Sequence, residues 1–352
     1  MLHGTKIIIL KMSKKKEILV TGGLGYIGSH MVLELAKNDY EVVILDNCAN
    51  SDIKTLSLIR DFTQQDIAFY KGDLIDPDIL SSIFKNHNIE IVAHFAALKS
   101  VSDSVKYPQK YYKNNFIGTM NLLELMNKNS VYKILFSSSA TVYGKPDYIP
   151  LDEMHPLNPI NPYGSSKVFI EKYLSDLALS DSKWSIVSLR YFNPLGAHQS
   201  GLFGENLNNE PTNIMPILMQ AALKQKQAIK IFGSDYETSD GTGVRDYIHI
   251  DDLIDGHMLS INFMKKKNGY EVFNLGSEKG HTVLEIIKEV EKVSGRKINY
   301  QFANRRKGDV AICIASTKKA KNVLNWQAKR DLNLMCVDSW NSIKKIQKNK
   351  KS

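Results

Sequence analysis

Short apolar segments alternate with amphipathic segments through the first half of the chain. Apolar runs of strand length occupy residues 17–21, 41–45, 67–70, 89–94 and 131–136. Between the first two runs, apolar residues recur at Ile27, Met31, Leu33 and Leu35, a spacing that predicts a helix with one buried face. Buried strands separated by helices are typical of a parallel sheet covered on both faces, so the pattern predicts an α/β fold.

The pattern changes in the second half of the chain. Residues 103–127 are expected to form a long helix, and residues 184–189 a further strand. After Asn193, longer irregular connections replace the regular alternation. We therefore predict a first domain over residues 12–192 and a second, smaller mixed α/β domain over most of residues 193–352.

Two segments depart from this simple division. The apolar stretch at 270–275, within a segment near 245–277, is expected to return to the sheet of the first domain. Residues 1–11 precede a second methionine, Met12, which leads through lysines into the first strand. We expect residues 1–11 to be an N-terminal extension that takes no part in the fold.

Composition narrows the class of protein without changing this picture. The 352 residues are 43% hydrophobic and 24% charged, which is ordinary for a globular protein. The net charge of +9 comes largely from scattered lysine clusters, so we expect no nucleic-acid partner. Cys48, Cys313 and Cys336 are widely spaced, which argues against a disulfide framework or a metal site and favours the reducing cytoplasm. No apolar run approaches the roughly 20 residues of a membrane span, so no membrane partner is expected.

A glycine-rich turn joins the first strand to the first helix. Gly22, Gly25 and Gly28 allow a tight turn, a close approach of the backbone to a pyrophosphate, and packing of the helix on the sheet. Asp46 ends the second strand, 18 residues after Gly28. An acid there binds a ribose diol and repels a 2′-phosphate, which predicts NAD as the cofactor. A turn-forming aspartate before Asn47 remains an alternative.

Other polar residues follow the later strands of the predicted sheet. Ligands of open α/β sheets bind beyond the carboxyl ends of the strands. Asp73 could there reach adenine, and Lys99 a phosphate or the nicotinamide ribose. The hydroxyl of Ser139 can donate to a substrate oxygen as that oxygen changes charge. For Asp73 and Ser139 taken singly, a turn or cap role stays open.

The segment from 163 to 167 carries the candidate chemistry. In a helix, residues four apart share a face, so the ammonium of Lys167 is expected near the phenol of Tyr163. A nearby cation favours the phenolate, so we predict a lowered pKa for Tyr163 and a role as general base. A half-exposed tyrosine beside a solvated lysine is the alternative when the pair is taken alone.

Together, these segments resemble the extended short-chain dehydrogenase/reductases, and among them the UDP-glucose 4-epimerase family. The resemblance covers about residues 17–340. Its marks are the segments 21–30, 45–47, 94–99, 136–144, 163–167, 189–194 and 241–249, of which the last is the most specific to the epimerases. It implies a Rossmann-type parallel sheet flanked by helices, with a mixed α/β C-terminal substrate domain.

The resemblance also implies a role for individual residues. The catalytic residues would be Tyr163, Lys167 and Ser139. The residues that contact NAD would be Gly22, Gly25, Tyr26, Ile27, Gly28, Asp46, Asn47, Asn50, Asp73, Leu74, Phe95, Ala96, Lys99, Asn114, Tyr163, Lys167 and Tyr191. The residues that contact the UDP-sugar would be Ser139, Tyr163, Asn193, Asn213, Ile231, Phe232, Arg245, Arg306, Asp309 and Cys313. No metal is expected.

The implied reaction is reversible epimerisation of UDP-glucose and UDP-galactose at C4, through a 4-keto intermediate and with tightly bound NAD. It would serve galactose metabolism and the supply of sugars for surface polysaccharide. Cys313 stands where epimerases restricted to plain hexoses tend to carry tyrosine, so UDP-N-acetylglucosamine and UDP-N-acetylgalactosamine are expected as further substrates. An inert buried cysteine is the alternative. Family analogy implies a homodimer through the helices near 103–127 and 163–179.

Two other functions are less consistent with the sequence than the epimerase. A sugar-nucleotide 4,6-dehydratase of this fold carries an acid pair directly after the strand-end serine or threonine, whereas Ala140 and Thr141 occupy that place here. A protein that binds NAD without catalysis typically lacks the tyrosine or the lysine, and this chain retains both. Both features favour the epimerase.

Overall fold

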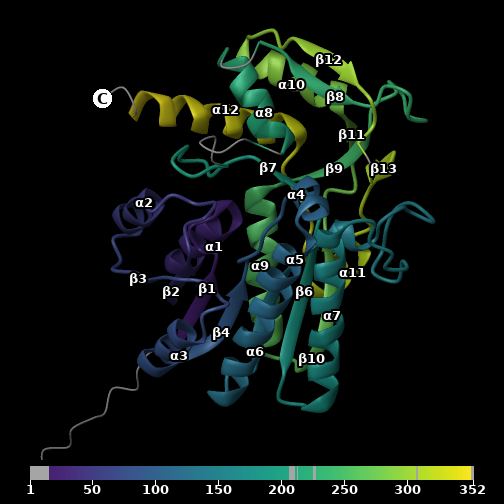
Figure 1. Ribbon diagram of the computed structural model, residues 1–352. Coiled ribbons are helices and arrows are strands. Elements are labelled where there is room, and N and C mark those ends of the chain that lie inside the picture. The colour runs from purple at the N-terminus through teal and green to yellow at the C-terminus, as the bar shows by residue number, and fades with distance from the viewer. Residues whose placement is uncertain (1–15, 206–210, 212, 225–226, 307, 350–352) are drawn as a thin grey trace, which may run out of the picture.

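A seven-stranded sheet forms the centre of the first half of the molecule (Figure 1). The computed structural model describes residues 16–205, 211, 213–224, 227–306 and 308–349. The strand order is β10-β6-β5-β4-β1-β2-β3, and every pair of neighbours is parallel. The strands are β1 (Glu17–Thr21), β2 (Glu41–Asp46), β3 (Ala68–Lys71), β4 (Ile89–His94), β5 (Lys133–Ser139), β6 (Ser185–Tyr191) and β10 (Gly269–Leu275).

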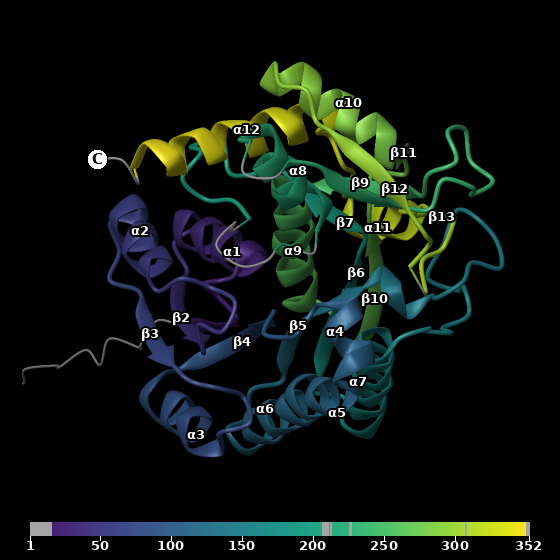
Figure 2. The same ribbon diagram turned by 45° about the horizontal axis from the view of Figure 1, so that its top comes forward.

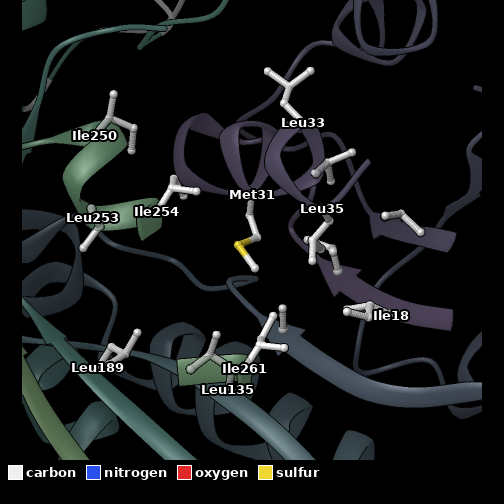
Figure 3. Close-up of a cluster of buried hydrophobic side chains, with 14 of the residues drawn as sticks. Ile18, Met31, Leu33, Leu35, Leu135, Leu189, Ile250, Leu253, Ile254 and Ile261 are labelled. Carbon is white, nitrogen blue, oxygen red and sulfur yellow. The ribbon is translucent and has the colours of Figure 1, made fainter. Parts of the chain in front are cut away.

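Helices cover both faces of this sheet, which is why the middle of most of its strands is apolar. On one face lie α1 (Tyr26–Lys37), α2 (Lys54–Thr63), α9 (Ile250–Met264) and α11 (Lys318–Leu324). On the other lie α3 (Pro77–Asn86), α6 (Gly118–Lys128) and α7 (Pro162–Ser180). Figure 3 shows the first of these two cores, in which Met31 and Leu35 of α1 lie close to Ile254 of α9 and Leu135 of β5.

The second part of the chain lies at one end of the large sheet (Figures 1 and 2). Its strands are β7 (Asn193–Leu195), β8 (Ile229–Phe232), β9 (Val244–His249), β11 (Gly280–Thr282), β12 (Tyr300–Ala303) and β13 (Ile312–Cys313). Its helices are α8 (Ile214–Ala222), α10 (Val283–Ser294) and α12 (Leu332–Asn349), which share a core of their own. Tyr26 joins the two parts, because its hydroxyl donates to the carbonyl of Gly196 at 2.8 Å.

The predicted long helix over 103–127 is wrong in detail. The segment contains α4 (Val101–Lys106), α5 (Pro108–Tyr111) and a π-helical turn, η1 (Tyr112–Ile117), before α6 begins. Pro108 has no amide hydrogen to donate, so a continuous helix cannot pass through it unbroken. The π turn contains Asn114 and Asn115, and such turns are frequent at functional sites.

The prediction of the fold class was more accurate. The parallel α/β fold is confirmed, and the strands begin and end within a few residues of the expected positions. All three cysteines are free thiols. Within the described residues, no helix is long and apolar enough to cross a membrane, and no cluster of side chains is suited to hold a metal ion. The expected extension over residues 1–11 lies outside the described residues.

Candidate active site

The glycine turn between β1 and α1 is built for a close backbone approach. Gly22 has a positive φ of 71°, and a Cβ atom there would lie 2.8 Å from the amide nitrogen of Ala96. A Cβ atom on Gly28 would lie 2.1 Å from the carbonyl oxygen of Gly22. Gly25 precedes α1, and no side chain of the described residues caps that helix end. The first amides of α1 are therefore suited to receive the pyrophosphate of a dinucleotide.

Asp46 is fixed beside this turn. One carboxylate oxygen accepts from the amide of Leu24 at 3.0 Å, and the other from the amide of Cys48 at 2.8 Å and the hydroxyl of Ser51 at 2.9 Å. These bonds leave lone pairs for a ribose diol, because each carboxylate oxygen can accept more than one hydrogen bond. The residues present thus fit the adenosine half of NAD.

Several predicted cofactor residues line the same edge of the sheet. The amide of Asn47 donates to Asp73 at 2.8 Å, which joins the loops after β2 and β3. The others lie at strand ends or at the start of a helix: Tyr26 and Ile27 in the first turn of α1, Asn50 after β2, Leu74 after β3, and Phe95 and Ala96 after β4.

The three predicted catalytic residues meet at the end of β5. Asn161 caps α7, since its side chain accepts from the amide of Gly164 at 2.8 Å, and the helix then carries Tyr163 and Lys167. The Lys167 ammonium donates to the carbonyl of Ser137 at 2.6 Å and lies 5.8 Å from the centre of the Tyr163 ring.

The hydroxyl of Ser139 faces Tyr163 with a proton to donate. Its oxygen accepts from the amide of Thr141 at 3.2 Å and from the Thr141 hydroxyl at 2.9 Å. Its own proton remains for a third partner, and a hydrogen bond from Ser139 acts to lower the pKa of the Tyr163 phenol. The arrangement can therefore hold one oxygen between a serine and a tyrosine.

Burial, rather than the neighbouring ammonium, dominates the protonation of this pair. It raises the pKa of Tyr163 to about 12 and lowers the pKa of Lys167 to about 7. The predicted lowered pKa of Tyr163 is therefore wrong for the chain by itself. The physical reason is that the desolvation of a phenolate outweighs the hydrogen bond from Ser139, and the lysine ammonium points at Ser137.

Asn115 is a structural residue of the site that the sequence analysis did not single out. In the π turn, its side-chain oxygen accepts from the amide of Leu98 at 2.8 Å, and its amide donates to the carbonyl of Leu98 at 2.9 Å and to Ser166 at 3.3 Å. It thereby ties the loop that carries Lys99 to α7. Asn114, its predicted neighbour, donates to the Asn115 side chain at 3.0 Å.

Glu205 is a second residue that the sequence analysis missed. Its carboxylate lies 3.0 Å from the ammonium of Lys99 and accepts a hydrogen bond from the amide of Asn213. A predicted cofactor residue and a predicted substrate residue are thus joined by one carboxylate. Its only signal in the sequence is an acid shortly after the segment 189–194, which is too weak to select it.

The hydroxyl of Tyr191 is bound to a buried histidine, although it also lies near Ser137 and Tyr163. Nδ1 of His257 donates to the carbonyl of Leu253 at 2.7 Å, so Nε2 is the acceptor for the Tyr191 hydroxyl at 2.5 Å. A contact between Tyr191 and the cofactor would therefore use its ring or its backbone, and it stays a prediction.

Besides Ser139 of β5 and Tyr163 of α7, the predicted substrate residues come from β7, β8, β9, β13, the loop before β13 and the residue before α8, Asn213. Arg306 pairs with Asp309 at 2.9 Å and lies over the ring of Phe232 at 4.8 Å. Next to Phe232 on β8, Ile231 is buried in the core of the second part. Asn193 begins β7, directly after Phe192.

Cys313 stands opposite Arg245 in the β13–β9 pair. It packs against a small cluster that includes Ala140, the residue after Ser139, and Phe192. Burial raises the pKa of its thiol to about 11, so the group is neutral at physiological pH.

Comparisons with known proteins agree with this geometry. The family model described as GDP-mannose 4,6 dehydratase matches residues 19–338. The chain is 50% identical over 323 residues to UDP-glucose 4-epimerase of Bacillus subtilis (strain 168), covering 92% of this chain and 95% of that protein. Fold, site and family model together define a short-chain dehydrogenase/reductase of the kind that modifies nucleotide sugars.

Solved structures agree with the curated relative. UDP-glucose 4-epimerase from Stenotrophomonas maltophila, with bound NAD and formylated UDP-arabinopyranose, superposes with a TM-score of 0.91 at 40% identity, over 95% of this chain and 99% of that one. The UDP-Glc/GlcNAc 4-epimerase from Campylobacter jejuni gives a TM-score of 0.81 at 34% identity, over 94% and 99%. The chain belongs to the UDP-glucose 4-epimerase family, which confirms the resemblance and the enzyme class expected from its sequence.

Proposed function

We propose that this protein interconverts UDP-glucose and UDP-galactose at C4 of the sugar and keeps NAD bound through turnover. The observation that carries the proposal is the meeting of Ser139, Tyr163 and Lys167 at the end of β5 in the first part of the chain, near the glycine turn and Asp46. In metabolism, such a reaction serves the use of galactose and the supply of sugars for surface polysaccharide.

The cofactor is held by the glycine turn and by Asp46, with Asn114, Lys99 and Lys167 toward its nicotinamide end. The chemistry that bound NAD supplies is reversible hydride transfer at C4, through a 4-keto sugar, together with the positive charge of its nicotinamide ring. Asp46 selects NAD over its 2′-phosphorylated form, because a second negative charge beside this buried carboxylate is repelled.

Tyr163 and Ser139 handle the proton of the 4-hydroxyl. The Tyr163 phenolate accepts this proton as the C4–H bond breaks, and the Ser139 hydroxyl donates to the same oxygen. Two positive charges, the Lys167 ammonium and the nicotinamide ring, favour the phenolate against the cost of burial. On the return step, the phenol gives the proton back, so neither a proton nor a reductant is consumed.

The second part of the chain binds the nucleotide. Arg245 and Arg306 are suited to a diphosphate, because a guanidinium can donate two parallel hydrogen bonds to one phosphate. Asp309 would accept from a ribose hydroxyl of uridine, and Phe232 would lie against the uracil. Asn193 and Asn213 would donate to the diphosphate and the sugar, which requires Asn213 to exchange its bond to Glu205 for one to the ligand.

We further propose activity on UDP-N-acetylglucosamine and UDP-N-acetylgalactosamine. The 4-keto sugar must turn over in the site before hydride returns to its other face, and a 2-acetamido group needs room for that rotation. Cys313 is small and packs against the buried cluster that contains Phe192, against which Ala140, the residue after Ser139, also packs. A tyrosine at this position would add a ring to the space beside the sugar.

Dehydration of the sugar is the second candidate, and the site disfavours it. Ala140 and Thr141 form the 3₁₀ turn η2 (Ala140–Val142) directly after Ser139, and the Thr141 hydroxyl is committed to Ser139. Neither side chain can act as the carboxylic acid that elimination of a hydroxyl requires.

The decisive experiment supplies purified protein with UDP-galactose, and separately with UDP-N-acetylgalactosamine, without added NAD. Epimeric product in both tubes is expected. Tyr163→Phe removes one hydroxyl and should reduce turnover at least about 100-fold while NAD, released on denaturation, stays stoichiometric. Full activity in Tyr163→Phe, or a 4-keto-6-deoxy product, would contradict the proposed reaction.

A further inference from the structure

A buried ion pair lies behind the catalytic residues. Tyr163, Lys167 and Glu171 follow one another at four-residue spacing on α7, so they share the face of the helix that packs on the sheet. Glu171 is 3% exposed and Arg190 of β6 is 4% exposed. Glu171 accepts from Arg190 at 2.6 Å and at 3.1 Å through its two carboxylate oxygens, which is a bidentate pair.

The same carboxylate also holds the strand that carries the catalytic serine. The hydroxyl of Ser138 donates to Glu171. Ser138 lies between Ser137, whose carbonyl accepts from Lys167, and Ser139 itself. One side chain of α7 therefore contacts the short stretch of β5 that positions both the lysine ammonium and the serine hydroxyl.

We propose that Glu171 is a positioning residue of this active site, which keeps Lys167 protonated and in reach of Ser137. The inference rests on the proposed function, in which the Lys167 ammonium supports the Tyr163 phenolate. Arg190 has the complementary role, because its guanidinium supplies the opposite charge and the hydrogen bonds that a buried carboxylate needs. Glu171 does not contact the reacting atoms.

The charges around Lys167 support this role. The titratable groups brought there by α7 and the elements packed on it are Tyr163 and Glu171 of α7, Tyr111 of α5, His94 of β4, Tyr143 after η2, Arg190 and Tyr191 of β6 and Tyr270 of β10. Burial keeps the tyrosines protonated and holds the pKa of His94 near 3, so that ring is neutral. Glu171 is therefore the negative charge that opposes the lowering of the Lys167 pKa by burial.

The test is the pH dependence of kcat in Glu171→Gln, which keeps the size of the side chain and removes its charge. Lys167 should then lose its proton at lower pH, so the upper limit of the activity window moves down by about one pH unit or more. The lower limit should not rise, because Lys167 stays protonated on the acid side in both proteins. Glu124→Gln, which removes an exposed carboxylate from α6, is the matched control and should leave both limits unchanged.

The double variant Glu171→Gln/Arg190→Gln keeps the test informative if the single variant does not fold with Arg190 unpaired. Removing both charges should give a smaller shift than removing Glu171 alone. The ionisation of Tyr163 can also be followed by ultraviolet absorbance in the absence of substrate. The Tyr163 signal is the part of the absorbance change that is lost in Tyr163→Phe. Unchanged pH limits, or a uniform fall of kcat at every pH with an unchanged titration, would overturn the role of Glu171 even in an active epimerase.

Discussion

At the scale of single residues, Cys313 offers the sharpest test of substrate range. The side chain packs beside the turn that follows Ser139, where added volume would enter the space of the sugar. We expect Cys313→Tyr to lower kcat/KM for UDP-N-acetylgalactosamine at least about tenfold more than for UDP-galactose, a difference of roughly 1.4 kcal/mol. The measurement is the ratio of the two constants in both proteins.

Cys313→Ser is the control for this substitution. It preserves the volume of the side chain, so both substrates should be turned over as in the parent enzyme. Equal losses on both substrates in Cys313→Tyr would show that the ring distorts the site in general, and the volume argument would then fail.

The grouping of the three candidate catalytic residues was predictable because their signals are local. Four-residue spacing places Lys167 beside Tyr163 on any helix, and a strand end places Ser139 at the ligand edge of a parallel sheet. Glu205 and Asn115 could not be selected, since their roles depend on partners more than a hundred residues or a whole loop away. The pKa of Tyr163 was missed for a related reason: burial is a property of the fold.

At the scale of elements, the π turn η1 makes a testable distinction between two adjacent asparagines. Asn115 is 1% exposed and satisfies both backbone groups of Leu98. We expect Asn115→Ala to lower the free energy of unfolding by about 3 kcal/mol, because it leaves buried polar groups without partners. Chemical denaturation of the NAD-loaded protein measures this loss.

Asn114→Ala is the matched variant one position earlier. Asn114 is only partly buried and donates to the Asn115 side chain, so its loss should change stability by less than about 1 kcal/mol. If Asn114 contacts the cofactor, this variant should instead release NAD more readily during gel filtration. Equal destabilisation by the two substitutions would contradict the division of roles.

Hydrophobic periodicity predicts most of the helices and strands of the large sheet, with one error. Apolar runs located the strands of the large sheet because a buried parallel strand has no polar alternation to confuse it. Periodicity predicts a single helix over 103–127, but Pro108 lies within this segment and interrupts it. The π turn that follows has no sequence signature, since it is stabilised by the contact of Asn115 with a distant loop.

At the scale of the whole molecule, three buried histidines predict loss of stability in mild acid. The pKa is lowered to about 3 for His30 and His94 and to about 4 for His257, because their burial disfavours the charged ring. An unfolded histidine titrates near about 6.5, so below that pH the unfolded chain binds protons that the folded chain refuses. Each ring then costs about 1.4 kcal/mol of stability per pH unit.

Asp246 affects the pH dependence of stability in the opposite direction. Its pKa is raised to about 6 by burial, so it favours folding as the pH falls. Burial raises the pKa of Glu153, Asp251 and Asp255 in the same direction, whereas the lowered pKa of His198 adds to the effect of the three histidines. We expect the free energy of unfolding to fall steadily between about pH 6.5 and 4.5, and His257→Gln to flatten this slope. A stability that does not change over this range would show that these histidines are protonated in the folded protein.

Four exposed apolar side chains gather on the helices α4, α5, η1 and α7. They are Val105 (57% exposed), Tyr107 (49%), Ile117 (44%) and Phe169 (49%). Aromatic contacts join part of this surface. The ring of Phe169 stacks on that of Tyr112, with 5.9 Å between ring centres, and lies edge-on to that of Phe116, with 6.2 Å between ring centres. We propose that it is the contact between two copies of the chain, because exposed apolar side chains on adjoining helices are typical of an interface.

Phe169→Glu tests this dimer with a control on the same helix. Under two-fold symmetry the patch packs against its own copy, so each substitution places two carboxylates in one interface, and the protein should become monomeric. Leu179→Glu lies near the end of α7 at a site that is 82% exposed, outside the patch, and should leave the mass unchanged. Light scattering after gel filtration gives the mass of each variant. Tyr163 and Lys167 are on the opposite face of α7, packed on the sheet, so we expect the monomer to retain activity. A Phe169→Glu variant that is still a dimer would place the interface elsewhere.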